Sequence, residues 1–183
     1  MEKMTETPQT SKRISKPRIN IPIIPKSEVK ILFVCNGNIS CSPMAEFIMK
    51  ELVRRAGLED QFLISSAATT TEELGNDMYP NAKAELKLHG IPFSKRRARQ
   101  IKSSDYNDWD FIIAMDQENL SDINYVVGND PLKKVRLLMS LTGEKNRSVS
   151  DPWYTRDFAK AYNDIYCGCE AMLNHIKNES WNK

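Results

Sequence analysis

Residues 29–43 read VKILFVCNGNISCSP. The apolar run at residues 29–34 is rich in residues that favour β-structure, which is typical of a strand buried on both faces of a sheet. A polar loop, residues 35–42, follows it, and Ser42-Pro43 then predicts a helix start, with serine as the N-cap and proline in the first turn. A strand, a polar loop and a helix in this order are expected at the opening of an α/β fold.

The rest of the chain repeats this alternation of strand and helix. The first helix is expected to stop at Gly57, because glycine readily ends a helix. We expect further strands at residues 62–66, 111–115 and 135–139, and further helices at residues 80–88, 117–125 and 155–177. The predicted fold class is therefore α/β, in three layers, with a four-stranded, mostly parallel sheet and helices on both faces.

The composition predicts one domain in a reducing compartment, the cytoplasm. The chain has 183 residues, with 26 Lys and Arg against 24 Asp and Glu, a net charge of +2 that argues against a nucleic-acid partner. No apolar stretch approaches the ~18 residues that a transmembrane segment needs. Four cysteines in a chain of this length do not indicate a disulfide scaffold. The two histidines, His89 and His175, are far apart, so we expect no metal site and no cofactor.

The first part of the chain, residues 1–28, differs from the rest. It is polar and basic, and prolines interrupt it repeatedly. We expect a flexible basic extension here, because such a segment buries too little apolar surface to offset the entropy lost on ordering. A docking segment, a membrane-surface segment or a transit peptide are the alternatives, although Glu2 and Glu6 weaken the last. The folded domain is then residues 29–183.

The loop after the first strand has the features of an anion site. It lies at the carboxyl edge of the predicted sheet, where α/β proteins bind ligands. Gly37 helps its amides to curl inward, and the following helix adds its positive end. Cys35 stands first in the loop, where these groups favour a reactive thiolate. Ser42 can hydrogen-bond to the sulfur, and Asn38 can hold the loop. The alternative, that Cys35 is an inert buried cysteine, is disfavoured by the Gly-Asn and Ser-Pro pairs beside it.

A second group of functional residues is Asp151-Pro152-Trp153-Tyr154, before the last helix. An aspartate next to two aromatic residues can act as a general acid, while the aromatic rings wall a slot for a planar substrate. The alternative is that Asp151 caps the terminal helix. Its pairing with a cysteine-containing anion loop favours the catalytic interpretation.

With these residues in place, the chain resembles the low-molecular-weight protein tyrosine phosphatases over about residues 29–176. Their signature is Cys-x-Gly-Asn-x-x-Arg-Ser-Pro near the first strand and Asp-Pro-aromatic-Tyr near the C-terminus. Residues 66–69, 89–91, 98–100 and 115–119 also look like family landmarks. The matching signature residues are Cys35, Gly37, Asn38, Ser42, Pro43, Asp151, Pro152, Trp153 and Tyr154.

The resemblance implies a reaction at Cys35. This residue would attack phosphorus and form a phosphocysteine, and Asp151 would protonate the leaving tyrosyl oxygen and later deprotonate water. The implied substrate is a phosphotyrosine protein or a small aryl phosphate, and inorganic phosphate is released. Trp153 and Tyr154 would flank the phenyl ring. The loop residues implied to bind the phosphoryl group are Asn36, Gly37, Asn38, Ile39, Ser40 and Ser42.

The chain departs from the family pattern at Cys41, which stands where the family has arginine. Arginine grips two phosphoryl oxygens and balances negative charge, which a thiol cannot do, and a thiolate there would repel the substrate. Losing one oxyanion-hole donor costs roughly 10²–10³ in turnover, so we expect weak catalysis. Arg96 and Arg97 are candidates to supply the missing charge. The alternative function is an inactive phosphate-loop module that binds phosphorylated partners.

The remaining cysteines and one glutamate add further hypotheses. Glu72 lies near where many family members have an aromatic wall, which leaves Trp153 as the main stacking surface. Cys35 and Cys41 are close enough in sequence to suggest a reversible disulfide. A Cys167/Cys169 pair resembles half a metal site, but a place on the last helix explains it better. Arsenate reduction, which related folds perform, is disfavoured by the Asp-Pro-Trp-Tyr motif and by the remoteness of that pair.

Overall fold

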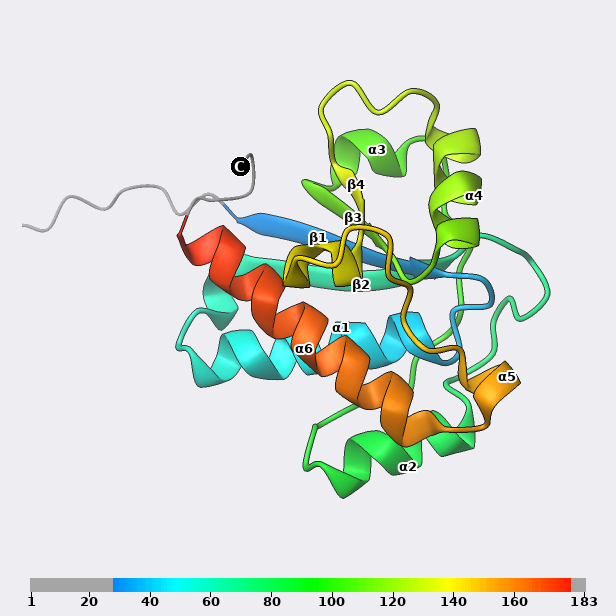
Figure 1. Cartoon of the computed structure of the whole chain (residues 1–183), viewed down its shortest axis with the longest axis vertical. Helices are drawn as coiled ribbons and strands as arrows, with labels where there is room; N and C mark the ends of the chain where they lie inside the picture. The colour runs from blue at the N-terminus through cyan, green and yellow to red at the C-terminus, as the bar shows by residue number, and fades with distance from the viewer. Residues whose placement is uncertain (1–27, 179–183) are drawn as a thin grey trace, which may run out of the picture.

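The computed structural model describes residues 28–178. Its sheet has four parallel strands in the order β2-β1-β3-β4 (Figure 1). The strands are β1 (Val29–Cys35), β2 (Phe62–Ala68), β3 (Phe111–Ala114) and β4 (Val135–Leu137). The prediction of a four-stranded parallel sheet is confirmed, and the strand that carries Cys35 lies inside it, between β2 and β3.

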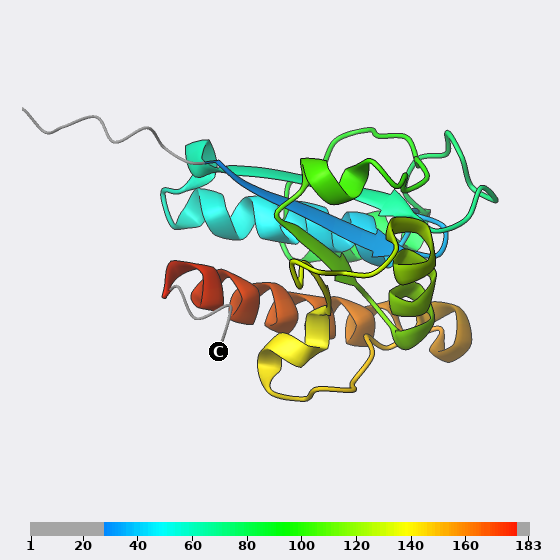
Figure 2. The same ribbon diagram turned by 90° about the horizontal axis from the view of Figure 1, so that it is seen from above.

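Helices cover both faces of the sheet because β1 is apolar on both sides. Ile31 and Phe33 belong to one core, which α1 (Cys41–Arg55) and α6 (Phe158–Lys177) cover together with α2 (Pro80–Leu88). Figure 2 shows α1 and α6 lying along the sheet on the same side. The alternation of side chains along a strand sends the intervening residues to the opposite face. The three-layer prediction is therefore confirmed.

The second face has a smaller core. Leu32 and Val34 of β1 pack there with residues of β3 and with Ile123. The helices on this side are α3 (Asp105–Asp108) and α4 (Gln117–Val127). Because β3 lies next to β1 and leads into α4, the turn between β3 and α4 comes to the same sheet edge as the loop after β1.

The last helix packs on the body through a buried apolar face and approaches it very closely at one glycine. Gly168 of α6 faces Leu138, in the 3₁₀ turn η2 (Leu138–Thr142), and a Cβ on the glycine would lie 2.5 Å from Leu138 Cγ. No real side chain tolerates such a distance, so only glycine allows α6 to approach this turn. This packing fixes the helix that follows the Asp151 segment.

Several predicted boundaries are wrong. Helix α1 begins at Cys41 with Ser40 as its N-cap, not at Ser42, whose hydroxyl bonds to loop atoms instead. The strand predicted to reach residue 139 ends at Leu137, where η2 takes over. The terminal helix begins at Phe158, because a separate short helix, α5 (Pro152–Thr155), precedes it. The sequence prediction also missed α3 and the turn η1 (Glu59–Gln61).

Two predictions concern the chain as a whole. The predicted basic extension lies outside the described residues, apart from Glu28. Among residues 28–178, none of the helices combines the length and apolarity required to cross a bilayer.

Candidate active site

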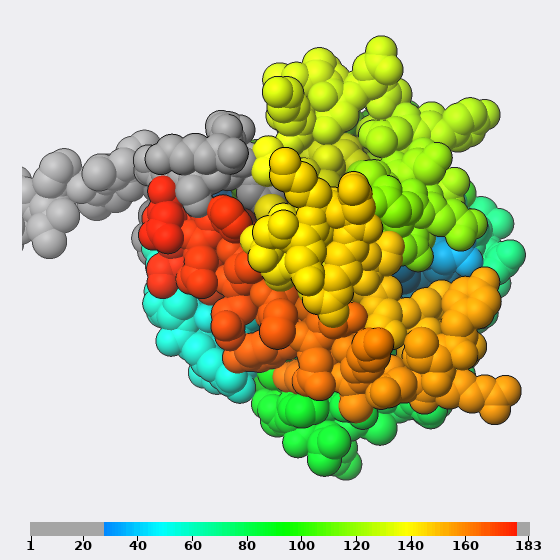
Figure 3. All heavy atoms as spheres, viewed as in Figure 1, coloured from blue at the N-terminus to red at the C-terminus, as the bar shows by residue number. Residues whose placement is uncertain are grey.

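A pocket of about 500 Å³ opens at the carboxyl end of the sheet. The loop after β1 lies in it, with residues 115–119 after β3 and residues 149–154 before α6 among its walls. Figure 3 shows the loop in blue at the bottom of a depression between α4 and the segment of α5. Chain segments more than 100 residues apart in the sequence therefore meet here, as expected at the carboxyl edge of a parallel sheet.

The sulfur of Cys35 is hydrogen-bonded inside the loop. Its Sγ lies 2.9 Å from Ser42 Oγ and accepts from the backbone N–H of Asn38 at 3.3 Å. Ser42 Oγ also accepts from Asn38 Nδ2 at 2.9 Å, so its own hydrogen can go to the sulfur or to the carbonyl oxygen of Ala67, which lies 3.5 Å away. Both expected roles, Ser42 at the sulfur and Asn38 as the residue that holds the loop, agree with this geometry.

Asn38 is the centre of the loop's support. It is fully buried and has a φ of 57°, in the left-handed region that asparagine tolerates better than most residues. Arg96 lies behind it: its Nη1 donates to the Asn38 carbonyl oxygen at 2.5 Å, and its Nη2 donates to Asn38 Oδ1. The backbone N–H of Arg99 donates to the same Oδ1 at 3.3 Å. The loop is thus fastened from behind by a guanidinium.

Neither of the two arginines expected to supply the missing charge lies on the pocket side of the loop. Burial lowers the pKa of Arg96, while the charges of Glu46, Cys35 and Asp77 act in the opposite direction. The guanidinium remains charged because its ordinary pKa is far above neutral. Arg97 is exposed, and neither arginine lines the pocket. Arg96 therefore acts on the loop from its far side rather than on a bound phosphoryl group.

The pocket side of the loop offers backbone donors. Within residues 28–178, no group accepts a hydrogen bond from the backbone N–H of Gly37, Ile39 or Ser40. Helix α1, 15 residues long, begins directly after them and adds the positive end of its dipole. Asn36 also lines the pocket, whereas Asn38 and Ser42 are buried and absent from its lining. The loop thus separates into residues that face a ligand and residues that hold the others.

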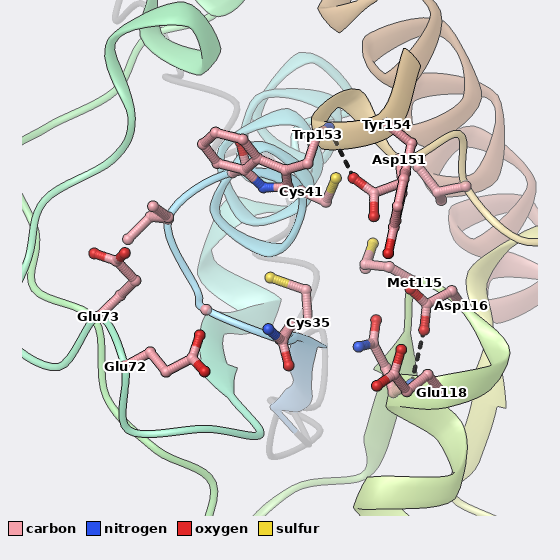
Figure 4. A pocket seen from close by; sticks show the side chains of 16 residues that line it. Cys35, Cys41, Glu72, Glu73, Met115, Asp116, Glu118, Asp151, Trp153 and Tyr154 are labelled. Atoms are coloured by element: carbon pink, nitrogen blue, oxygen red, sulfur yellow. Dashed lines mark hydrogen bonds between the residues drawn. The ribbon is translucent and has the colours of Figure 1, made fainter. Parts of the chain in front are cut away.

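Cys41 borders the pocket in the first turn of α1, and Figure 4 shows its sulfur on the same cavity as that of Cys35. Burial raises the pKa of the Cys41 thiol well above its usual value, and the negative charges of Cys35, Asp151 and Asp116 raise it further. Both effects favour the neutral thiol over the thiolate that would repel the substrate. Both cysteines are free, so the reversible disulfide stays a prediction.

Asp151 comes to the pocket from α5. Its Oδ1 accepts from the backbone N–H of Trp153 at 2.9 Å, so it caps α5, while Asp157 caps α6. The predicted alternative, that Asp151 caps the terminal helix, is therefore wrong, because Asp151 caps α5 instead. Its place in the pocket lining agrees with the catalytic interpretation. Trp153 packs against Tyr79, with ring centroids 4.7 Å apart, and Tyr154 is 89% exposed at the rim.

Several residues of the site were missed. Glu73, Asp116 and Glu118 line the pocket together with the anticipated Glu72. The sequence did carry a signal for Asp116 and Glu118: they follow a buried strand, and residues at that place lie at the sheet edge where Cys35 also lies. Tyr79, which supports Trp153, carried no signal in the sequence.

Cys167 and Cys169 lie together on α6, away from the pocket, with Cys167 exposed and Cys169 buried. Burial raises the pKa of Cys169, which favours its neutral form. In the part of the chain that is described, no group of three or more His, Cys, Asp or Glu side chains is arranged to hold a metal ion.

Comparison with known proteins agrees with the parallel sheet and the cysteine loop. A family model described as low molecular weight phosphotyrosine protein phosphatase matches residues 30–182. That range includes both Cys35 and Asp151. The chain belongs to this family.

Individual relatives match over nearly their whole length. The low molecular weight protein-tyrosine-phosphatase YfkJ of Bacillus subtilis is 35% identical over 152 residues, which are 82% of this chain and 97% of YfkJ. Its crystal structure has a TM-score of 0.80 and covers 84% of this chain and 97% of that one. The human low molecular weight phosphotyrosine protein phosphatase is 36% identical over 149 residues, 78% of this chain and 92% of its own. These relatives are named as enzymes.

Proposed function

We propose that this protein hydrolyses phosphotyrosine or a small aryl phosphate through a cysteinyl-phosphate intermediate. The observation that carries the proposal is the Cys35 sulfur, hydrogen-bonded by Ser42 and Asn38 within a loop of unpaired backbone donors. The names of the relatives, protein-tyrosine phosphatases, support the substrate class. A compartment that keeps thiols reduced, the cytoplasm, suits a reaction that needs a free cysteine.

The first step is the transfer of the phosphoryl group to the enzyme. The Cys35 thiolate attacks phosphorus, an S–P bond forms, and the P–O bond to the tyrosyl oxygen breaks. Asp151, in its protonated form, gives its proton to that oxygen, so the leaving group departs as neutral phenol. The backbone N–H groups of Gly37, Ile39 and Ser40 would bind the phosphoryl oxygens, and Trp153 would stack on the phenyl ring.

The second step regenerates the enzyme. Asp151, now a carboxylate, removes a proton from a water molecule, and the water oxygen attacks phosphorus. The P–S bond breaks, inorganic phosphate leaves, and the Cys35 sulfur returns as a thiolate held by Ser42 and Asn38. The protons balance over the two steps, because Asp151 gives one and takes one back.

We further propose that Cys41 weakens this reaction. A neutral thiol supplies neither the bidentate hydrogen bonds nor the positive charge of an arginine at this place. Among residues 28–178, no Lys or Arg lines the pocket to replace it. Loss of one donor to a developing oxyanion is worth roughly 10²–10³ in turnover, so we expect the wild-type rate to be low by about that factor.

Turnover of an aryl phosphate tests the proposal. We expect slow release of phosphate by the wild type, none by Cys35→Ala, and a rate raised about 10²–10³-fold in Cys41→Arg. Cys167→Arg is the matched control, since the same substitution on the exposed face of α6 adds the same charge away from the pocket. Equal rates in the wild type and Cys35→Ala would refute the nucleophile, and no gain in Cys41→Arg would refute the explanation of low activity.

A second candidate function is a module that binds phosphorylated partners without hydrolysing them. It is favoured by one observation: a thiol stands at position 41 in a pocket that receives no basic side chain from residues 28–178. Phosphopeptide binding in the absence of any Cys35-dependent turnover would support it over the enzyme.

A further inference from the structure

The pocket around the cysteine loop has acidic walls. Glu72 and Glu73 line one side, Asp116 and Glu118 line the other, and Asp151 completes the set. Figure 4 shows the two pairs on opposite sides of Cys35. In the part of the chain that the structure describes, no Lys, Arg or His lines this pocket. The site therefore combines donors for an anion at its base with negative charge around its mouth.

These carboxylates are not neutralised by neighbouring cations. Glu73 accepts from Asn76 Nδ2 at 2.7 Å and Asp116 from the backbone N–H of Asn119 at 2.7 Å, both neutral donors. No Lys or Arg among residues 28–178 forms an ion pair with any of the four wall carboxylates. Elsewhere a buried acid, Glu51, is paired with two arginines. The negative charge at the mouth is thus left facing the pocket.

An independent observation points to a ligand at the base. Ser40 lines the pocket and is only 3% exposed, yet its hydroxyl has no hydrogen-bond partner among the described residues. A buried polar group without a partner is costly unless a ligand or water satisfies it. Together with the unpaired N–H groups of Gly37 and Ile39, it provides donors for oxygen atoms of a bound anion.

An anion alone is a poor match for this pocket. A dianionic phosphate on its way to Cys35 passes between carboxylates, and no side chain in the lining offsets the repulsion. A ligand that carries positive charge next to its phosphate fits the pocket better. Its cations pair with the acidic walls, which removes the repulsion, while its phosphate reaches the loop. A lysine or arginine beside a phosphotyrosine is the simplest such arrangement in a protein substrate.

We propose that the pocket selects phosphotyrosine flanked by Lys or Arg, with Glu72, Glu73, Asp116 and Glu118 as the residues that determine this specificity. The proposal rests on the proposed function and names its substrate class. The substrate's own cation then partly restores the positive charge that the loop lacks beside Cys41. Phosphotyrosine flanked by acidic residues is the disfavoured class.

Three phosphotyrosine peptides of one length test this, with basic, neutral or acidic residues on both sides of the phosphotyrosine. We measure kcat/KM for the wild type, and the Kd of each peptide for Cys35→Ala. At low ionic strength we expect a preference of about tenfold or more for the basic over the acidic peptide, which falls as salt rises because exposed charges are screened. The double variant Glu72→Gln, Glu118→Gln, which removes one charge from each wall, should reduce the preference to about threefold or less.

The matched control removes two charges elsewhere. Asp60→Asn with Glu170→Gln changes two exposed acids outside the pocket and should keep the wild-type preference. Equal kcat/KM and equal Kd for all three peptides would overturn the inference. So would a preference that survives in the wall variant or that disappears equally in the control, since either would assign it to the general charge of the molecule.

The experiment separates this inference from the proposed function. A small aryl phosphate without other charged groups has no flanking residues, so its turnover reports on the chemistry of Cys35 alone. If that turnover occurs and peptide charge has no effect, the inference fails and the proposed function stands. If no substrate is turned over, the enzyme proposal fails, and the Kd series with Cys35→Ala still decides whether the acidic walls select basic peptides.

Discussion

The two halves of the site, residues 35–42 and residues 151–154, are built in different ways. In the first, Asn38 and Ser42 are fully buried, and their side chains join the sulfur of Cys35 to Arg96 on the far side of the loop. In the second, Asp151 is held by a bond to the N–H of Trp153, two residues away, and Tyr154 is almost fully exposed. One half is fixed by the core and the other mainly by local contacts.

This difference predicts how the two halves respond to substitution. A change in the loop disturbs buried hydrogen bonds and therefore costs both stability and activity. A change in residues 151–154 removes a chemical group and therefore costs activity, but it changes the stability of the fold very little. The comparison matters for function, because a nucleophile must be held in place before substrate arrives, whereas an acid at the rim needs only to reach the leaving group.

The largest effect is expected for Asp151→Asn. Asparagine caps a helix about as well as aspartate, so α5 should persist and the free energy of unfolding should change by less than about 0.5 kcal/mol. Because the amide cannot donate a proton, kcat for an aryl phosphate should fall about 10²–10⁴-fold. Parallel phosphate-release assays and urea unfolding curves measure both.

Asp157→Asn is the control, since it makes the same substitution at the N-cap of α6. Asp157 does not line the pocket, and its variant should retain the wild-type rate. A large loss of stability in Asp151→Asn would contradict the view that this half is only locally held.

The fold was largely predictable because its signals are local. The apolar run of β1 and the helical spacing of α6 each reveal burial directly, and the predicted and observed α2 coincide at residues 80–88. Boundaries failed where a tertiary partner intervened. Ser42 has the chemistry of an N-cap, but the neighbouring sulfur and the amide of Asn38 use its hydroxyl, so the helix starts at Cys41.

The sequence predicted the residues of the site that stand in motifs, but not the residues that hold them in place. Cys35 and Asp151 stand in patterns that a resemblance reveals, and both line one pocket. The contact between Arg96 and Asn38 joins residues 58 positions apart, and no local pattern encodes it. The facing of the acidic walls was missed for the same reason: Glu72 was anticipated and Asp116 follows a buried strand, but only the fold brings the turns after β2 and β3 to one pocket.

The second largest effect is expected for Asn38→Ala, which tests the buried half. The change removes the bond to Ser42 Oγ, leaves a guanidinium donor of Arg96 without its acceptor, and puts alanine at a φ of 57°. Bonds to charged groups and unusual backbone angles each contribute, so the free energy of unfolding should fall by about 2–4 kcal/mol. Denaturant unfolding monitored by circular dichroism measures it.

Asn36→Ala provides the comparison within the same loop. Asn36 is exposed, and none of the hydrogen bonds in the described region involves its side chain. Its variant should lose less than about 0.5 kcal/mol. Similar losses for the two asparagines would mean that the loop is not held through Asn38, and the contrast between the two halves would disappear.

The smallest effect is expected for Asp77, whose carboxylate holds the backbone of Arg96. Its carboxylate accepts from Lys83 Nζ and the backbone N–H of Met78, each at 2.7 Å, and from the backbone N–H of Arg96 at 3.2 Å. Burial acts to raise the pKa of Asp77, but these donors outweigh it and lower the pKa to about 2. Because this is below the unfolded value of about 3.9, the carboxylate stabilises the fold above about pH 4, and that stabilisation is lost as the pH falls towards 2.

Asp77→Asn should therefore destabilise the protein at pH 7 by about 1–2 kcal/mol, and the difference from the wild type should shrink between pH 4 and pH 2. Unfolding midpoints at several pH values measure it. Asp60→Asn, which changes an exposed acid, is the control and should show almost no difference at any pH. If Asp77 supports the loop through Arg96, the Asn variant should also lose activity at pH 7, although it touches neither Cys35 nor the pocket. A destabilised variant with full activity would confine the support of the loop to Asn38 and Arg96 themselves.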